Sequence, residues 1–283
     1  MAQYIDFKGR KVNLDSPPES IVSLNPSITE TLFLIGMGER VKGVSAFCRR
    51  PAEVERIRKI GSYSTYNEKI MDDINPDLIL TISGYQDSLA DNLAKKYNLY
   101  QLELPSTPFQ ILDMINRIGI VAGKVREARV LSIELIKKMK THLPQFRAYV
   151  EIDLGGPVTF GSQSYIISTL NTMGFETPYD CEPKEWIMPD YDVIKKFDPE
   201  IIIMEGKMYR GMTKEEAMER LKEHGLEKTS AFHKGRVFTT PGKLDFLAHH
   251  GPDFFNSAIP WIENIYQLMS DESKHTNINT GIE

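Results

Sequence analysis

Residues 67–82 have the sequence NEKIMDDINPDLILTI, and residues 190–204, DYDVIKKFDPEIIIM, repeat its pattern. Each stretch joins a segment with helical spacing of its apolar residues to an Asn-Pro or Asp-Pro turn, and then to a continuous apolar run. A continuous apolar run is typical of a strand in a parallel sheet that is covered on both faces. The repeat therefore predicts a similar α/β lobe in each half of the chain.

The first half of the chain alternates strands and helices around residues 67–82. Strands are predicted at residues 21–24, 41–44, 77–82 and 99–104, and helices at residues 27–35 and 87–96. Ser27 followed by Glu30 fits a capping box at the start of the first helix, and Gly36 or Gly38 fits its end. A βαβα order of this kind predicts an open parallel sheet with right-handed crossovers.

The second half follows the same order. Strands are predicted at residues 148–152, 200–204 and 236–238, and helices at residues 164–173, 213–225 and 252–269. Thr213 followed by Glu216 fits a second capping box. Ligands of open parallel sheets bind at the carboxyl ends of the strands. We therefore expect the carboxyl ends of the strands of both lobes to face one ligand cleft.

A long helical pattern separates the two halves. Apolar residues recur at spacings of three and four between Pro108 and residue 143, and Pro144 follows. One helix of this length would extend about 50 Å at 1.5 Å per residue. It is either an ordinary helix that kinks at Gly119 or Gly123, or a spine that joins the lobes. The return of strand and helix patterns after Pro144 favours the spine.

These patterns predict the fold class and the domain organisation. The fold class is α/β, with two Rossmann-like lobes that contain parallel sheets and are joined by one long spine helix. The parts are an N-terminal lobe at residues 1–107, the spine at 108–143, a C-terminal lobe at 144–270 and a flexible polar tail at 271–283.

The composition excludes several classes of protein. Of the 283 residues, 41% are hydrophobic and 26% charged, as in ordinary soluble globular proteins. Lys and Arg number 34 and Asp and Glu 39, and the formal net charge of -5 argues against a nucleic-acid partner. Two cysteines, Cys48 and Cys181, are too few for a disulfide-rich scaffold or a four-cysteine zinc site.

The first residues of the chain do not decide in which cellular compartment the protein works. Residues 1–11 are polar and charged and lack the apolar segment of a signal peptide. The longest apolar runs, such as 32–35 and 201–204, are far shorter than the roughly 20 residues of a membrane span. The protein is expected to be cytoplasmic if Met1 is the native start, and extracytoplasmic, in the periplasm or at the cell surface, if a leader was removed.

The common catalytic motifs do not occur in the sequence. It contains no His-Glu-x-x-His, no Gly-rich phosphate loop that ends in Lys-Ser/Thr, and no Gly-x-Ser-x-Gly. Gly36-Met37-Gly38 follows a predicted helix rather than a strand, and therefore indicates a helix end rather than a dinucleotide site. No catalytic residues are therefore predicted from these motifs.

Two neighbouring stretches resemble a known family. Residues 21–32, IVSLNPSITETL, and residues 36–44, GMGERVKGV, resemble the start of the substrate-binding proteins of ABC importers for cobalamin and ferric siderophores. Further matching stretches are residues 6–14, 67–80, 119–128 and 230–238. The resemblance extends from residue 4 to residue 269. It implies two α/β lobes joined by one long helix. It also implies a short hairpin at residues 6–14 that leads the first lobe.

Within this family the chain is most similar to the cobalamin-binding branch, which implies ligand contacts. Tyr63 and Trp186 fall where that branch places one cleft aromatic on each lobe, and Phe47 follows the second strand. Asp245 and Phe246 fall on a late loop that reaches the ligand. Aromatic walls suit a broad, flat, amphipathic ligand such as a corrin. The alternative for each ring is a packed core residue.

Other candidate ligand contacts carry charge or could bind a metal. Arg50, beside Arg49, could attract the acidic rim of a ferric chelate or could simply be solvated. His249, His250, Cys48 and Cys181 could offer an axial ligand to the metal of a bound chelate. Their spacing matches no metal site, so no metal site of the protein itself and no cofactor are predicted; His249 and Arg50 are kept as ligand contacts.

The resemblance also implies a membrane partner. Proteins of this family dock on the arginines of an ABC permease through one carboxylate on each lobe. Glu68 is the candidate on the first lobe, although it is one residue out of register. Asp192 is the candidate on the second lobe, where Glu is usual, and Asp190 lies nearby. The alternative is that these carboxylates are ordinary solvated surface.

The function predicted from the sequence is a monomeric carrier that binds a corrinoid in the cleft and delivers it, by transient contact, to a membrane permease. A ferric-siderophore or haem carrier is the alternative within the class. Tyr63 and Tyr66 are candidate ligands of a haem iron in that case. A tetrapyrrole- or metal-handling enzyme that uses His249, His250 and Glu205 is a competing class. A cytoplasmic sensor is the third alternative.

Overall fold

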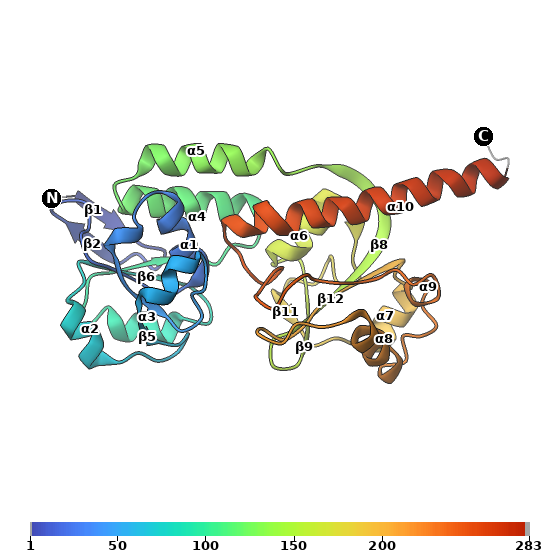
Figure 1. Cartoon of the computed structure of the whole chain (residues 1–283), viewed down its shortest axis with the longest axis horizontal. Coiled ribbons are helices and arrows are strands. Elements are labelled where there is room, and N and C mark those ends of the chain that lie inside the picture. The colour runs from blue at the N-terminus through green and yellow to red at the C-terminus, as the bar shows by residue number, and fades with distance from the viewer. Residues whose placement is uncertain (1, 281–283) are drawn as a thin grey trace. The chain divides into compact units, whose positions relative to one another are not determined.

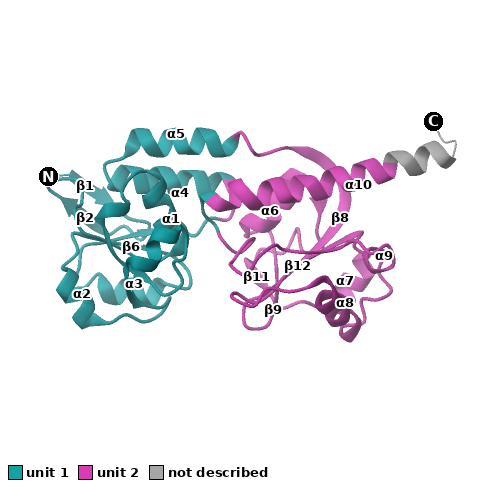
Figure 2. Ribbon diagram, in the orientation of Figure 1, with its two compact units in different colours: residues 1–105, 109–136, 250–252 teal, residues 106–108, 137–249, 253–283 magenta. Residues whose placement is uncertain are grey.

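The computed structural model describes the backbone of residues 2–280 and the side chains of residues 2–273. The chain forms two compact units, coloured separately in Figure 2. Unit 1 comprises Met1–Pro105, Phe109–Ile136 and His250–Pro252. Unit 2 comprises Ser106–Pro108, Lys137–His249 and Asp253–Glu283. No helix of the described residues is long and apolar enough to cross a membrane.

Unit 1 is built on a parallel sheet, as the sequence predicts, but the sheet has five strands rather than the four predicted (Figure 1). Its strand order is β5-β4-β3-β6-β7. The strands are β3 (Ile21–Ser23), β4 (Val41–Ser45), β5 (Arg58–Gly61), β6 (Leu78–Ile82) and β7 (Leu99–Leu102). The chain runs outward from β3 in one direction and from β6 in the other. The strand order therefore reverses between β3 and β6, where ligands of open α/β sheets bind.

Apolar side chains on the sheet and its helices form the core of unit 1. Val22, Ile79, Leu89 and Leu93 are buried in one cluster. The helices are α1 (Pro26–Leu34), α2 (Glu68–Ile74), α3 (Asp87–Leu93), α4 (Pro108–Val121) and α5 (Val125–Ile136), with 3-10 turns at Gly38–Arg40 and Ala52–Arg56. The leading hairpin is present as β1 (Ala2–Ile5) and β2 (Lys11–Leu14). Strand β5 was not predicted.

The start of α1 differs from the predicted capping box. The N-cap is Asn25, not Ser27, and its Oδ1 accepts the backbone N–H groups of Ser27 at 2.9 Å and Ile28 at 3.3 Å. Pro26 occupies the first helical position, where its missing N–H costs nothing. An asparagine followed by proline therefore starts the helix two residues earlier than Ser27 would.

The single spine helix predicted over residues 108–143 is wrong. The chain forms α4 and α5, which lie side by side in Figure 1, and α5 ends at Ile136. Gly123 has a φ of +72°, which breaks the helix at one of the two glycines that offered a kink. A Cβ on Gly119 would lie 2.3 Å from the Cβ of Ala128, so the two helices approach closely there.

We expect Gly119→Ala to destabilise the protein. In an open helix this change stabilises by roughly 0.5–1 kcal/mol. Here overpacking should instead lower the free energy of unfolding by about 1–3 kcal/mol, as measured by urea denaturation. Gly156→Ala is the control, because nothing lies within 4 Å of its Cβ position. Equal effects of the two changes would contradict the close approach of α4 and α5.

Unit 2 is built on a mixed sheet, whereas the sequence predicted a parallel one. Its order is β11-β9-β8-β12-β13, and β10 pairs with the start of β8. The strands are β8 (His142–Asp153), β9 (Pro157–Phe160), β10 (Met173–Glu176), β11 (Trp186–Ile187), β12 (Ile201–Glu205) and β13 (Val237–Thr239). Strands β8, β12 and β13 are parallel, and β9 and β11 are antiparallel additions. Gly155, with a φ of +102°, permits the tight β8–β9 turn.

The helices of unit 2 are α6 (Tyr165–Thr172), α7 (Tyr191–Phe197), α8 (Lys214–Glu223), α9 (Ser230–His233), a π-helical turn at Phe254–Ala258, and α10 (Ile259–Thr280). The capping box of Thr213 and Glu216 is confirmed at the start of α8. Helix α10 continues past the predicted end at residue 269. The predicted tail at 271–283 is therefore helical as far as Thr280, and residues 281–283 lie outside the described part. A polar sequence without Gly or Pro does not end a helix.

The sequence repeat corresponds to a repeat in structure. Helices α2 and α7 each have seven residues and begin at an N-cap whose side chain accepts backbone N–H groups, Asn67 and Asp190. Each ends at a left-handed residue, Asn75 at φ +46° and Asp198 at φ +51°, directly before proline. Asparagine and aspartate tolerate this conformation better than most residues, which explains why each turn begins with one of them.

Candidate functional site

Three aromatic side chains lie at the carboxyl ends of the parallel strands of unit 1. Phe47 follows β4, Tyr63 follows β5 and Tyr85 follows β6. The rings of Phe47 and Tyr63 are stacked, with centroids 4.2 Å apart and planes 6° apart. Tyr85 meets Tyr63 edge-on at 5.1 Å. We call these three residues the aromatic cluster. Phe47 and Tyr63, predicted from sequence as ligand contacts, are thus brought together.

Asn25 fixes the exposed member of the aromatic cluster. Its Nδ2 donates to the hydroxyl of Tyr85 at 2.9 Å while its Oδ1 caps α1. Nε2 of His250 lies 3.4 Å from the same Nδ2. Asn25 follows β3 and Tyr85 follows β6, so this hydrogen bond spans the point where the strand order reverses. Asn25 and Tyr85 were not predicted from the sequence as site residues, although each lies within three residues of the end of an apolar strand.

Cys48 lies in the interior of unit 1, next to the cluster in sequence. It is fully buried, and its Sγ lies 3.1 Å from Oγ1 of Thr29 and 3.2 Å from Oγ of Ser45. Burial raises the pKa of the thiol above its usual value, which keeps it neutral and unreactive. Cys181 is exposed on unit 2, and both thiols are free. Among the described residues no three His, Cys, Asp or Glu side chains are grouped to hold a metal ion.

The two arginines after Cys48 differ in their partners. Nη1 of Arg49 donates to both carboxylate oxygens of Glu55, at 2.8 and 2.9 Å. Arg50 is half-buried on the same loop as Phe47. The charge of Arg49 is balanced locally by Glu55, and Arg50 stays a predicted contact for an acidic ligand rim.

In unit 2 a buried carboxylate holds the predicted ligand loop. Glu205 is the last residue of β12 and is 4% exposed. Its two carboxylate oxygens accept the backbone N–H groups of Phe246 at 3.0 Å and Leu247 at 2.6 Å. Burial, the largest cause, raises the pKa of Glu205 to about 7. Glu205 therefore anchors the loop, and its oxygens are already occupied there.

The predicted contacts on that loop differ in exposure. Asp245 is half-buried. Phe246 is 9% exposed and meets Trp261 edge-on at 5.6 Å, as a packed core ring does. His249 and His250 are both buried. Of the five residues on this loop and its anchor named from sequence, Asp245 is the most open to solvent.

Trp186 is the exposed aromatic of unit 2 that the sequence predicted. It lies on β11, opposite Phe160 of β9, and is 44% exposed. Met188, two residues on, is 84% exposed. An exposed tryptophan beside an exposed methionine offers apolar area for binding.

The two predicted docking carboxylates lie at the starts of the repeated helices. Glu68 is the first residue of α2 and pairs with Lys96 at 2.9 Å. Asp192 is the second residue of α7, pairs with Lys195 at 3.1 Å, and its side chain is 91% exposed. Both are surface groups. Counted from the N-caps, they are one residue out of register with each other.

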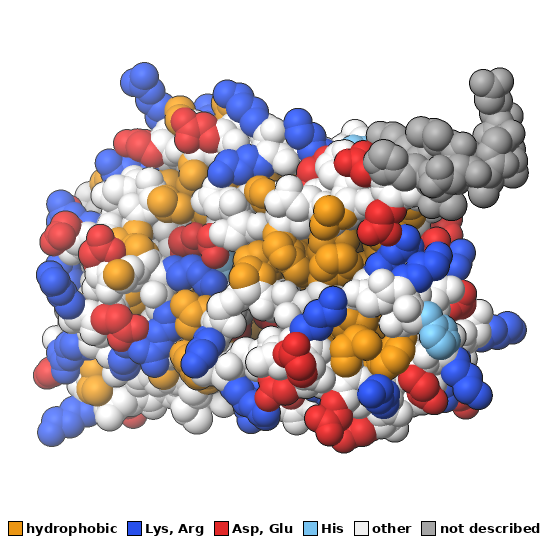
Figure 3. Space-filling view, turned by 45° about the vertical axis from the view of Figure 1, so that its right-hand side comes forward, with side chains coloured by type: hydrophobic (Ala, Val, Ile, Leu, Met, Phe, Trp, Pro, Cys, Tyr) orange, Lys and Arg blue, Asp and Glu red, His pale blue; other side chains and the backbone are white. Residues whose placement is uncertain are grey.

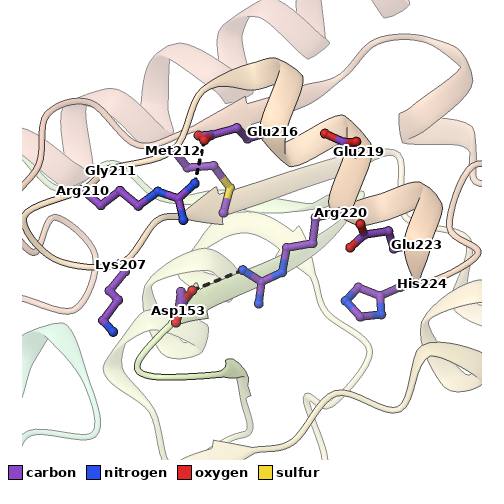
Figure 4. A pocket seen from close by; sticks show the side chains of 10 residues that line it. All are labelled: Asp153, Lys207, Arg210, Gly211, Met212, Glu216, Glu219, Arg220, Glu223 and His224. Carbon is purple, nitrogen blue, oxygen red and sulfur yellow. Dashed lines mark hydrogen bonds and ion pairs between the residues drawn. The ribbon is translucent and has the colours of Figure 1, made fainter.

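Unit 2 contains a charged groove that was not predicted from the sequence (Figure 4). It has a volume of about 450 Å³ and lies between the end of β8, the loop after β12 and helix α8. Arg220 pairs with Glu151 at 3.1 Å and with Asp153 at 3.5 Å, and Arg210 pairs with Glu216 at 2.8 Å. These charges largely neutralise one another, so the groove has no clear preference for a ligand of one sign.

Lys and Arg side chains alternate with Asp and Glu side chains over the face shown in Figure 3. This distribution, like the net charge of -5, differs from the continuous basic surface of a nucleic-acid binder.

The sequence pattern of the periplasmic binding protein family matches residues 21–244, most of the chain. The chain belongs to the periplasmic binding protein family, and the resemblance seen in its sequence is confirmed. The uncharacterized ABC transporter substrate-binding lipoprotein YvrC of Bacillus subtilis (strain 168) is 22% identical over 275 residues, 92% of this chain and 84% of the relative. A vitamin B12-binding protein of Photorhabdus laumondii is 21% identical over 202 residues, 69% of this chain and 73% of the relative.

Solved structures share the fold. The siderophore binding protein BauB, bound to a complex of two acinetobactin molecules and ferric iron, has a TM-score of 0.76 at 18% identity, covering 94% of this chain and 99% of that one. The periplasmic heme-binding protein RhuT from Roseiflexus sp. RS-1, in apo form, has a TM-score of 0.71 at 21% identity, covering 88% and 97%. These matches confirm the α/β fold class with its two lobes.

Proposed function

We propose that this protein is the substrate-binding component of an ABC importer and that its ligand is a corrinoid. The observation that carries the proposal is the aromatic cluster of Phe47, Tyr63 and Tyr85, which lies at the carboxyl ends of the parallel strands of unit 1. Its member Tyr85 follows β6, beside the point where the strand order reverses. Stacked rings offer a flat apolar wall, and the hydroxyl groups of the tyrosines suit an amide-bearing rim. The B12-binding relative supports this choice of ligand.

A ferric-siderophore or haem ligand is the alternative within the same class. The likeness to BauB and RhuT favours it. Tyr63 remains its candidate ligand contact in unit 1. Tyr66 packs against the core of that unit, which makes it a weaker candidate for a metal ligand.

The proposed carrier works outside the cytoplasm, as the lipoprotein relative suggests, and delivers its ligand to a permease. Glu68 and Asp192 are the proposed docking groups, because both are exposed at the starts of equivalent helices. A carrier of this kind performs no reaction and acts as a monomer. Glu205, His249 and His250, the residues of the enzyme alternative, are all buried.

Titration of the protein with cyanocobalamin, followed by tryptophan fluorescence, tests the proposal. We expect saturable one-to-one quenching, because the corrin absorbs near a tryptophan in the complex. The chain has two tryptophans, so Trp186→Phe should remove most of the signal change and Trp261→Phe should keep it. The bound ligand should be recovered unchanged by mass spectrometry, as from a carrier.

Haemin and ferrichrome serve as comparison ligands in the same titration. If one of these ligands saturates the protein and cyanocobalamin gives no response, the proposed ligand becomes an iron chelate instead of a corrinoid. No saturable binding of any of the three would contradict the carrier proposal. Release of a chemically altered ligand would favour the enzyme.

A further inference from the structure

Tyr209, on the loop after β12, has an unusual backbone conformation. Its φ is +71°, in the left-handed region that strongly favours glycine. The other non-glycine residues with positive φ in the described part of the chain are Asn75 and Asp198. Those two end helices and belong to residue types that tolerate this region, whereas a tyrosine there is strained.

The surrounding backbone holds Tyr209 in this conformation. Its N–H donates to the carbonyl oxygen of Lys243 at 2.6 Å, which ties the loop after β12 to the loop after β13. A Cβ on Gly206 would lie 2.3 Å from the carbonyl of Gly211, and one on Gly211 would lie 2.7 Å from the carbonyl oxygen of Gly242. The two loops are therefore packed backbone to backbone.

The second loop is itself fixed to the sheet. Glu205, directly before the first loop, accepts the N–H groups of Phe246 and Leu247. The carbonyl oxygen of Leu247 accepts the hydroxyl of Tyr165 at 2.6 Å. Because both loops are anchored, the direction in which Tyr209 leaves the backbone is set by the fold rather than by its own preference.

The strain at Tyr209 does not serve the core. The residue is 47% exposed, similar to Trp186 of the same unit at 44%. Glycine or asparagine adopts the left-handed conformation at a surface position with less strain than tyrosine does. A tyrosine kept there, half in solvent and at the carboxyl end of a parallel strand, is the kind of strained residue found at ligand clamps.

We propose that Tyr209 is a ligand-binding residue of unit 2, which rests on the proposed carrier function. Its ring contacts the apolar face of a broad macrocycle or metal chelate, and its hydroxyl reaches the polar rim of that ligand. The two anchored loops hold the ring in place before the ligand arrives, so that little freedom is lost on binding.

Tyr209→Gly separates this role from a structural one, because the two roles predict opposite changes in stability. The variant removes both the strain and the ring. We expect its urea midpoint to rise, while its affinity for the probe that binds the wild type, cyanocobalamin, haemin or ferrichrome, falls about tenfold. Tyr209→Phe, which keeps the ring, should bind within about threefold of the wild type.

Asn75→Gly in unit 1 is the matched control, because it relieves a positive φ at a helix end. Because asparagine already tolerates this region, Asn75→Gly should raise the urea midpoint less than Tyr209→Gly does, and it should leave the affinity unchanged. Wild-type affinity in Tyr209→Gly would overturn the inference and leave the carrier function standing. A lower urea midpoint in Tyr209→Gly would assign the ring to the fold and also overturn it. If the wild type binds none of the three probes, the proposed function itself fails.

Discussion

Replacing Arg220 by leucine is expected to lower the free energy of unfolding by about 3–5 kcal/mol, because it leaves a buried carboxylate without its cation. Glu151 is 2% exposed, and its Oε1 lies 3.1 Å from Nε of Arg220. The other oxygen, Oε2, accepts the hydroxyl groups of Tyr149 at 2.6 Å and Tyr191 at 3.1 Å. Urea denaturation at neutral pH measures the loss.

A second variant shows whether the charge of Glu151 causes the loss. In Glu151→Gln combined with Arg220→Leu the buried charge is removed together with its partner, and most of the stability should return. Arg210→Leu is the matched control in the same groove, because Arg210 and Glu216 form an exposed pair, and it should cost less than about 1 kcal/mol. If Arg210→Leu and Arg220→Leu lower the free energy of unfolding equally, the buried pair stabilises the protein no more than the exposed pair does, which would contradict the prediction.

Glu205 should make the stability of the protein fall as the pH rises. Burial raises the pKa of its carboxyl from 4.5 to about 7, so the folded state binds the proton more tightly than the unfolded state does. The stabilising effect of this proton is complete below pH 4.5 and is lost as the pH rises through 7. A shift of this size corresponds to about 3 kcal/mol. Glu205→Gln, which carries no charge, should lack this part of the pH dependence.

The measurement is urea denaturation of the wild type and Glu205→Gln at several values between pH 4 and 8. The difference in unfolding free energy should change by about 3 kcal/mol across that range, in favour of the variant at high pH. Glu185→Gln is a useful comparison, because burial raises the pKa of Glu185 to about 7 as well, yet Glu185 does not anchor the ligand loop. Only Glu205→Gln should also weaken ligand binding. Parallel pH profiles of Glu205→Gln and the wild type would contradict the prediction.

Much of the fold could be predicted because it depends on local patterns. The two Asx-Pro turns with their apolar runs indicate the buried strands β6 and β12 and the helices before them. The break between α4 and α5 could not be fixed in the same way. An apolar stripe at helical spacing fits one long helix and two antiparallel helices equally well, and the close approach of Gly119 to Ala128 is a contact between segments.

The candidate site shows the same division. Tyr63 could be named from the sequence because it falls where a known family places an aromatic residue, and Phe47 because it lies on the loop after the second predicted strand. Asn25 and Tyr209 could not, since their roles arise from contacts across the fold: a hydrogen bond to Tyr85 in one case and to Lys243 in the other. Phe246 shows the converse. Its place on the loop suggested ligand contact, whereas its packing on Trp261 depends on how the helix α10, which begins at Ile259, folds back on the loop.

Unit 1 is completed by a short return of the chain at His250–Pro252. A gene fragment that stops after Ile136 would therefore encode a lobe without the imidazole that lies beside Asn25. For recombination among relatives, the lobe is not a single interchangeable cassette. A chimaera that exchanges the first lobe must therefore also exchange codons 250–252. Otherwise the aromatic cluster comes from one parent and the histidine beside Asn25 from the other.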